Sequence, residues 1–341
     1  MKTPPDRRAR PAADRRPVLV VGATGQLGCR VVHRLAEAGR PVRAFVRPGG
    51  HHALVRRKGV DLVVGDLGDP ASVAAACAGA RAIVATANGL VPERGASFAT
   101  VEERGYGVLL DAAKQAGVGR FVFCSAPVTP HDARVPLFRA KRSVEARLTA
   151  SGLEHCIVRP GPFMDDWFAL IGSRLPLRGD PASVLRRPWG FLQTFQRAVG
   201  DLIERRGLAV VPGDETTTHA FIAVEDVAAF LIATIDHPEA RNRALDLAGP
   251  QRLSWGEVAA LYAEVLGRPV RVQGTPPWVF RLQLALMRPF SPSAASVMGL
   301  NWLAAVGMPL NDPGHLETFR VRRTLARDFL RSKAGLPAET P

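Results

Sequence analysis

The chain has 341 residues, of which 47% are hydrophobic, so it is long enough to bury a sizeable core in one large or two small domains. It carries 45 Lys and Arg residues against 31 Asp and Glu residues, a formal net charge of +14 at pH 7. Such an excess of positive charge can attract nucleic acid or an anionic membrane. Because no basic strand interleaved with aromatic residues is present, we expect a solvated arginine-rich surface and no specific nucleic-acid partner.

The N-terminal segment and the cysteines indicate the compartment. Residues 1–16 combine six basic residues with prolines and alanines, which predicts a disordered basic tail. This segment lacks the apolar core of a signal peptide, and Asp6 and Asp14 argue against a transit peptide. The four cysteines lie far apart without a Cys-x-x-Cys pair, which predicts buried, reduced thiols. No apolar run is long enough to span a bilayer, so we expect a cytoplasmic protein without a transmembrane segment.

From residue 17 onward, short apolar runs alternate with helical patterns, which predicts a parallel sheet with right-handed crossovers. The expected strands are residues 17–22, 42–46, 60–64, 82–87, 120–124 and 155–158. The expected helices are residues 26–39, a short helix after Gly50, a helix that starts at Asp69 and Pro70, and residues 98–116 and 136–150. Ligands of such a sheet bind at the carboxyl ends of the strands, near the switch point between the first and the fourth strand.

The most informative stretch joins the first strand to the first helix. Gly22, Gly25 and Gly28 follow an apolar run over residues 18–21, and a helical pattern starts at once. In this order, the first glycine lets the chain turn, the second lets a pyrophosphate approach the backbone, and the third lets the helix pack close to the strand. We therefore predict a dinucleotide site, with a tight turn that binds no ligand as the alternative. The further contacts expected at this turn are Thr24, Gln26 and Leu27.

The ends of the second and third strands indicate which dinucleotide binds. An Asp or Glu at the end of the second strand usually accepts hydrogen bonds from the adenosine ribose of NAD. This chain has Arg47 there, with Arg43 on the same strand, and a guanidinium can pair with the 2′-phosphate of NADP. We therefore expect NADP(H) to be favoured over NAD(H), with ordinary surface arginines as the alternative. Asp66 is expected to accept from the adenine amino group, whereas Asp69 fits the cap of the next helix better.

Further motifs accompany the glycine triplet: Val46-Arg47-Pro48, Gly65-Asp66, and the segments 111–118, 121–125 and 158–164. Together they resemble the atypical short-chain dehydrogenase/reductases, and within these the NmrA-like branch, over about residues 17–270. The resemblance implies an α/β fold, a Rossmann-type doubly wound parallel sheet with a smaller C-terminal substrate or lid region. It also implies NAD(P) binding, but no single reaction, because family members include reductases, isomerase-like proteins, redox-sensing regulators and assembly factors. The additional cofactor contacts that it implies are Leu67, Ala87, Pro160, Gly161 and Phe163.

The resemblance also implies a catalytic Ser, Tyr and Lys, of which this chain matches two. Ser125 ends the fifth strand where the family has the Ser that polarises a carbonyl, and Lys141 falls on the next helix. One helical turn before Lys141, where the family has its proton-donating Tyr, the residue is Leu137. Lys141 lies on the apolar stripe of its helix, so its ammonium needs a partner, and the cofactor ribose is the expected one. The alternative is a lysine whose charged end extends past its neighbours into solvent.

Because Leu137 cannot donate a proton, two hypotheses about function remain. In the first, the protein is an NADPH-dependent reductase of a small apolar substrate of the enone, quinone or benzylic type, in which Lys141 and water relay the proton. His131 is an alternative acid, Asp165 and Asp166 are either catalytic groups or helix caps, and no metal is expected. In the second hypothesis, the protein is a non-catalytic NADP(H)-binding regulator or assembly protein.

The strict alternation ends near residue 165, and this break divides the chain. We expect residues 17–165 to form the NAD(P)-binding Rossmann core, residues 166–330 the C-terminal substrate or lid region, and residues 331–341 a loose tail. Within the second region, residues 208–250 resemble the family segment that returns to the main sheet. Residues 174–190, which contain several Arg, Pro and Gly, are expected to form a loop.

The remainder of the C-terminal region contains helical and apolar segments. A helix is expected over residues 191–206, and Ser254 and Glu257 predict a capping box at the start of another. Residues 275–310 are apolar and interrupted by prolines. Ordinary core with a lid is the expected role of this segment, and a dimer surface or a membrane-surface helix are the alternatives. A homodimer is therefore one partner that the sequence allows, besides a small-molecule substrate.

Overall fold

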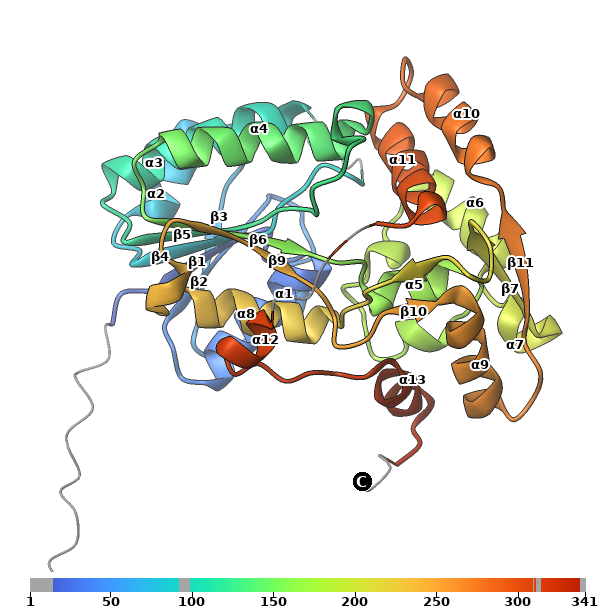
Figure 1. Cartoon of the computed structure of the whole chain (residues 1–341). Helices are drawn as coiled ribbons and strands as arrows, with labels where there is room; N and C mark the ends of the chain where they lie inside the picture. The colour runs from blue at the N-terminus through green and yellow to red at the C-terminus, as the bar shows by residue number, and fades with distance from the viewer. Residues whose placement is uncertain (1–14, 92–98, 309, 311–313, 338–341) are drawn as a thin grey trace, which may run out of the picture.

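A computed structural model describes residues 15–91, 99–308, 310 and 314–337 of the chain. Its central element is a parallel sheet of seven strands in the order β3-β2-β1-β4-β5-β6-β9 (Figure 1). The strand order reverses between β1 and β4, which makes the sheet doubly wound, as predicted. The strands are β1 (Val18–Val21), β2 (Val42–Val46), β3 (Val60–Val64), β4 (Ala82–Ala85), β5 (Arg120–Cys124), β6 (His155–Pro160) and β9 (Arg243–Leu247).

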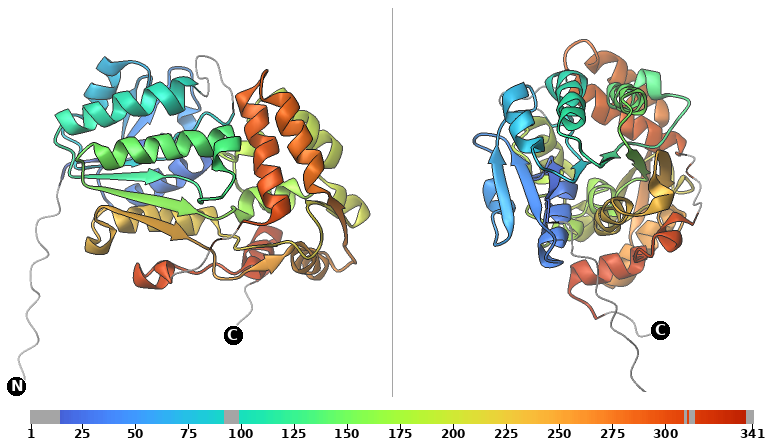
Figure 2. Two further views of the ribbon diagram at one scale, coloured as in Figure 1. Left: turned by 45° about the horizontal axis from the view of Figure 1, so that its top comes forward. Right: turned by 90° about the vertical axis from the view of Figure 1, so that its left-hand side faces the viewer.

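Helices cover both faces of the sheet, so its central strands are buried on both sides. Val20 of β1 pairs with Ala44 of β2 and Val84 of β4, and all three residues are fully buried. Such strands are continuous apolar runs, and for this reason they could be located from the sequence. One face carries α1 (Gln26–Glu37) and α8 (Val224–Thr234), and the other carries α2 (Pro70–Cys77), α3 (Tyr106–Gln115) and α4 (Pro136–Ala150) (Figures 1 and 2).

Two expected helices are divided in the structure. Instead of one helix over residues 98–116, a π-helical segment over Ala99–Gly105 precedes α3, and residue 98 lies outside the described residues. The expected helix over residues 191–206 is interrupted, which leaves α6 (Gly190–Val199) and α7 (Leu202–Arg206). Short 3₁₀ turns occupy His52–Leu54, Asp132–Arg134, Leu175–Leu177, Val184–Arg186 and Pro238–Ala240.

The C-terminal region forms a second, smaller core around Phe168, Trp255 and Tyr262. Of residues 208–250, only β9 joins the main sheet, because β7 (Leu208–Pro212) pairs with β11 (Arg271–Thr275) and β8 (Thr218–His219) pairs with β10 (Leu253–Ser254). The predicted capping box of Ser254 and Glu257 opens α9 (Trp255–Leu266). Three further helices of this region are α5 (Met164–Leu170), α12 (His315–Thr318) and α13 (Ala326–Ala334), the last of which extends into the expected loose tail.

The apolar segment 275–310 folds largely as a hairpin of α10 (Pro277–Met287) and α11 (Pro292–Val306). Buried residues of α11, such as Trp302 and Leu303, pack with Phe138 of α4 in one apolar cluster. The outer face of α10 is exposed. The expectation of ordinary core therefore holds for α11 and for the inner face of α10 only. Among the described residues, no helix is long and apolar enough to cross a bilayer. The cysteines Cys29, Cys77, Cys124 and Cys156 are buried and free, as predicted.

Candidate functional site

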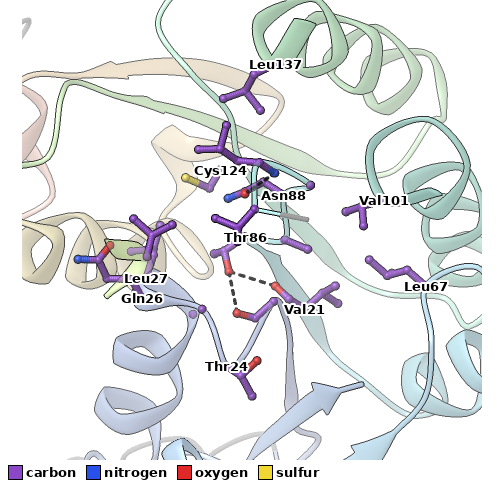
Figure 3. Close-up of a pocket in the computed structure, with 18 of the residues that line it drawn as sticks. Val21, Thr24, Gln26, Leu27, Leu67, Thr86, Asn88, Val101, Cys124 and Leu137 are labelled. Atoms are coloured by element: carbon purple, nitrogen blue, oxygen red, sulfur yellow. Dashed lines mark hydrogen bonds between the residues drawn. The ribbon is translucent and has the colours of Figure 1, made fainter. Parts of the chain in front are cut away.

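A pocket of about 320 Å³ lies at the carboxyl ends of β1, β2, β4 and β5. Figure 3 shows Gln26 and Leu27 on one side of it, Leu67 and Val101 opposite, and Leu137 at the far end from Thr24. The structure thereby brings together most of the residues that the sequence singled out. Those that line the pocket are Gly22, Thr24, Gly25, Gln26, Leu27, Gly28, Arg47, Asp66, Leu67, Ala87, Ser125, Lys141 and Phe163.

The glycine turn is built so that no side chain could replace its glycines without a clash or an obstruction. Gly22 has a φ of +82°, and a Cβ there would lie 2.6 Å from the Ala87 nitrogen. A Cβ on Gly28 would lie 2.2 Å from the Gly22 carbonyl oxygen, so only glycine lets α1 start this close to β1. A Cβ on Gly25 would have one neighbour within 4 Å, the Gly22 oxygen at 3.1 Å, and would otherwise occupy the space where a ligand approaches the backbone.

The N-terminus of α1 faces the same space and fits an anion. No side chain caps this end of the helix, and its first turn contains no acidic residue. Its backbone N–H groups and helix dipole therefore favour a negatively charged group such as a pyrophosphate. The Thr86 hydroxyl donates to the Val21 carbonyl at 3.1 Å and holds the end of β4 against the turn (Figure 3).

Arg187 adds a cation beside the glycine turn that the sequence did not reveal. It lines the pocket, and its guanidinium donates to the Thr24 carbonyl. The segment that carries it is tied to α1 through Asp180, which accepts from the Gln26 amide at 3.0 Å and pairs with Arg30 at 2.9 Å. Because Arg187 belongs to a region expected only as a loop, no sequence pattern could place it beside the turn.

The part of the pocket at β2 and β3 contains Arg47 and Asp66. Arg43 is not part of it, because its guanidinium donates to Asp61 at 2.8 Å and to two carbonyls near the end of α2. The Asp66 carboxylate accepts from the Gly68 amide at 2.7 Å and does not cap α2. Asp69 provides that cap instead, as predicted, through the amides of Ala71 and Ser72.

Lys141 lies at the pocket end formed by β5 and α4, and it is buried. Only 5% of the residue is exposed, so its charged end does not extend into solvent. Its ammonium lies 3.6 Å from a carboxylate oxygen of Glu102 and 4.9 Å from the centre of the Phe123 ring. The partner within the chain is Glu102, a residue that no sequence motif singled out. The contact of Lys141 with the cofactor ribose stays a prediction.

Glu102 belongs to the π-helical segment before α3, and it is fully buried. One of its oxygens accepts from the Gly89 amide at 3.2 Å, and the other has no hydrogen-bond partner among the described residues. Burial raises the pKa of Glu102, while the nearby Lys141 ammonium opposes this rise. Glu102 shares an apolar helical spacing with Tyr106, Leu109 and Ala113. A charge on an apolar stripe, the signal that singled out Lys141, would therefore have identified Glu102 as well.

Ser125 and Leu137 complete this end of the pocket. The Ser125 hydroxyl accepts from Arg142 at 3.4 Å, and Leu137 is buried beside the pocket. The chain has two tyrosines, and neither replaces the missing phenol. Tyr106 donates to the Ala87 carbonyl at 2.7 Å, and burial raises its pKa well above the usual value. Tyr262 donates to the Phe168 carbonyl in the second core.

Of the alternative acids, only Asp166 lines the pocket. His131 stacks on Trp302 of α11, with ring centres 4.6 Å apart. Asp165 pairs with Arg30 at 3.2 Å and accepts from the Val224 amide, which gives it a structural role. One Asp166 oxygen has no hydrogen-bond partner among the described residues. Burial and the neighbouring Asp165 raise the pKa of Asp166 to about 7.

Pro160 and Gly161 do not line the pocket, although the family resemblance implied cofactor contacts for them. Pro160 ends β6 and is buried. The Gly161 amide donates to the Leu247 carbonyl at 2.9 Å, and a Cβ on Gly161 would lie 2.7 Å from the Ala220 oxygen. Both residues therefore pack against the segment that returns to the sheet. Of Pro160, Gly161 and Phe163, only Phe163 lines the pocket.

Comparisons with known proteins agree with this architecture. The model of the NmrA-like family matches residues 14–295. An NAD(P)H azoreductase of Xenophilus azovorans is 30% identical over 254 residues, which cover 74% of this chain and 75% of the relative. The photosystem II assembly factor Ycf39 of Cyanophora paradoxa is 28% identical over 263 residues, 76% of this chain and 71% of the relative.

Solved structures share the fold. The triphenylmethane reductase of Citrobacter sp., in complex with NADP(H), superposes with a TM-score of 0.69 at 19% identity and covers 93% of this chain and 99% of its own. The fold, the family model and the sequence relatives therefore agree with the resemblance seen in the motifs. The chain belongs to the NmrA-like family of atypical short-chain dehydrogenase/reductases.

Proposed function

We propose that the chain is an NADPH-dependent reductase of a small apolar organic substrate, of the enone, quinone or benzylic type. The observation that carries this proposal is the position of Lys141, a buried ammonium in the wall of the pocket that also contains the glycine turn. The nearby wall includes Leu90, Cys124 and Leu137, which suit an apolar substrate. When bound, reduced nicotinamide supplies the hydride.

The proposed roles follow the length of the pocket. The glycine turn, the N-terminus of α1 and Arg187 bind the pyrophosphate. Arg47 pairs with the 2′-phosphate and Asp66 accepts from the adenine amino group. Phe163 packs beside the nicotinamide. In support of these roles, all of the named side chains line one continuous pocket.

Lys141 and Ser125 act at the reacting end. The Lys141 ammonium donates hydrogen bonds to the nicotinamide ribose and holds the proton that water delivers to the reduced substrate. The buried Glu102 carboxylate, 3.6 Å from this ammonium, holds it in position. After the proton passes to the substrate, solvent water restores the proton on Lys141. The Ser125 hydroxyl polarises a substrate carbonyl where one is present. Because Leu137 provides no acid, substrates in which hydride addition is the demanding step suit this site best.

A non-catalytic NADP(H)-binding regulator or assembly protein is the second candidate. Leu137, in place of the family's Tyr, favours it, since the pocket can bind a nucleotide without an acid. One relative, Ycf39, is named as a photosystem II assembly factor.

A turnover screen separates the two candidates. NADPH binding is measured first by titration, and NADPH oxidation is then followed with quinones, enones, azo dyes and triphenylmethane dyes. We expect Lys141→Met to abolish turnover while nucleotide affinity falls only severalfold, because most of the dinucleotide is bound elsewhere. Lys114→Met, which removes an exposed lysine of α3, is the matched control. Tight NADPH binding without turnover of any acceptor would favour the second candidate.

A crystal structure with NADP tests the site independently of activity. The expected result places the Lys141 ammonium within hydrogen-bond or single-water reach of the nicotinamide ribose. A longer separation would make Lys141 a purely structural partner of Glu102.

A further inference from the structure

The outer face of α10 exposes four large apolar side chains, named here the α10 stripe. Trp278, Leu282 and Leu286 are 66%, 53% and 58% exposed, and Phe290, just beyond the helix, is 87% exposed. The first three are spaced by four residues and therefore share one face of the helix. The opposite face contains Leu284, which is buried in the cluster with α11. Monomeric proteins rarely leave such a contiguous apolar surface without a partner.

The position of α10 leaves this face open to a large partner. In Figure 1, α11 lies between α10 and α4, so that α10 forms the outer edge of the molecule. The helix has 11 residues and cannot cross a bilayer, although it can lie flat on one.

The charged residues within the segment that carries the α10 stripe have one sign. Arg281 and Arg288 are both exposed, and their helical positions place them along one flank of the stripe. Residues 265–311 contain four arginines and neither Asp nor Glu, within a chain of net charge +14. Aromatic residues on the apolar face with arginines on its flank are the pattern of a helix that lies in the headgroup region of an anionic membrane.

We propose that the α10 stripe docks on the surface of an anionic lipid bilayer. Trp278, Leu282, Leu286 and Phe290 enter the headgroup region, and Arg281 and Arg288 pair with lipid phosphates. A second copy of the chain is the other candidate partner, but a two-fold interface would place the same patch against itself. The arginines of both copies would then meet without an acidic partner in this segment, whereas an anionic surface neutralises them. The inference does not depend on the proposed reaction.

Cosedimentation of the full chain with vesicles tests the proposal. We expect binding to vesicles of equal parts phosphatidylcholine and phosphatidylglycerol, weaker binding to phosphatidylcholine alone, and a loss of binding as salt is raised. Leu282→Glu should weaken binding at least about tenfold, because it places a negative charge in the centre of the stripe. The pair Arg281→Gln and Arg288→Gln should weaken it about thirtyfold.

Matched controls separate the stripe from general charge or exposure. Leu336→Glu changes an exposed leucine near the C-terminal end of the described residues. The pair Arg139→Gln and Arg178→Gln removes two exposed charges outside α10. These variants should bind vesicles within about twofold of the wild type. All variants alter exposed side chains, so thermal unfolding should report an unchanged fold.

Two results would overturn the proposal. The first is an absence of binding to the anionic vesicles, or equal binding by the wild type and Leu282→Glu. The second is a wild type that light scattering shows to be a dimer, a monomeric Leu282→Glu variant, and no vesicle binding by either. That result would assign the stripe to an interface between copies of the chain.

Discussion

The two ends of the pocket are built on different principles. The end at the β1–α1 turn is made mainly of main chain, namely three glycines and an uncapped helix N-terminus, with the side chains of Thr86 and Arg187 beside them. The end at β5 and α4 is made of side chains, and its central feature is the buried pair of Lys141 and Glu102. A main-chain site depends on the absence of side chains, which a local sequence pattern records. A side-chain site depends on partners distant in sequence, which only the fold brings together.

Substitutions at the two ends should also destabilise the protein in different ways. A new side chain in the glycine turn meets backbone that cannot move aside. Removal of one partner from a buried ion pair leaves the other charge without compensation, although removal of both partners can be almost neutral.

Glu102→Leu should cause the largest loss, because it leaves the Lys141 ammonium buried among Phe123 and Tyr106 without a carboxylate. We expect the free energy of unfolding to fall by about 3–5 kcal/mol in denaturant titrations. The double variant Glu102→Leu and Lys141→Met should recover most of this loss, because it replaces the pair with apolar groups. Glu103→Leu changes the exposed neighbour and should be almost neutral. A double variant no more stable than Glu102→Leu alone would contradict the prediction.

Gly28→Ala breaks the main-chain end. The new Cβ would lie 2.2 Å from the Gly22 oxygen, so that α1 must move away from β1. We expect a loss of about 3 kcal/mol in stability and a loss of measurable NADPH binding. Gly190→Ala is the matched control, since a Cβ there meets nothing within 4 Å. Unchanged NADPH affinity in Gly28→Ala would show that the turn does not hold the nucleotide.

Asp166 also lines the pocket, and its contribution to stability should depend on pH. Its pKa is raised from the usual 3.8 to about 7, so between these values the folded chain keeps a proton that the unfolded chain has released. The stability of the fold should therefore fall as pH rises from about 4 to about 7, by roughly 2 kcal/mol for a partly solvated group. Asp166→Asn should remove this fall and be more stable than the wild type above pH 7.

The comparison for Asp166→Asn is a set of thermal or denaturant unfolding curves across this pH range. Asp111→Asn, which changes an exposed carboxyl of α3, should leave the slope of stability against pH unchanged. If wild type and Asp166→Asn had parallel profiles, the carboxyl would be ionised throughout the range.

The same difference between local main-chain features and contacts of distant side chains decides which parts of the molecule the sequence predicts. The first six strands and the glycine turn were predicted because buried parallel strands and tight turns have local signatures. The division of the expected helix over residues 98–116 was not predicted. It accompanies the contacts of the Glu102 carboxylate with the Gly89 amide and Lys141, which lie outside this helix and leave no local pattern. The pairing of β7 with β11 was not predicted either. The strand β11 (Arg271–Thr275) has no continuous apolar run, and its partner β7 is distant in sequence.

Within the site, most residues identified by a motif line one pocket, whereas Pro160 and Gly161 of the motif over residues 158–164 do not. Pro160 pairs with Leu247 of β9, and a Cβ on Gly161 would lie 2.7 Å from the Ala220 oxygen, so both positions pack against the segment that returns to the sheet. Their cofactor contacts stay predictions. Arg187 could not be expected, because its position depends on the contacts of Asp180 with Gln26 and Arg30.

Arg47 should have the smallest effect of these residues, because it makes a single side-chain contact with the cofactor in the proposed arrangement. That contact is with the 2′-phosphate, away from Lys141. A charge-assisted pair with the 2′-phosphate should make NADPH bind more tightly than NADH by about 1–2 kcal/mol, or roughly tenfold. Arg47→Ala should lower the affinity for NADPH by this amount and leave that for NADH almost unchanged, since NADH lacks the phosphate. Titration of both nucleotides with the wild type, Arg47→Ala and Arg43→Ala gives the answer. Arg43 is bound by Asp61, so its loss should reduce stability without changing the ratio of the two affinities. Equal affinity of the wild type for both nucleotides would exclude the proposed contact.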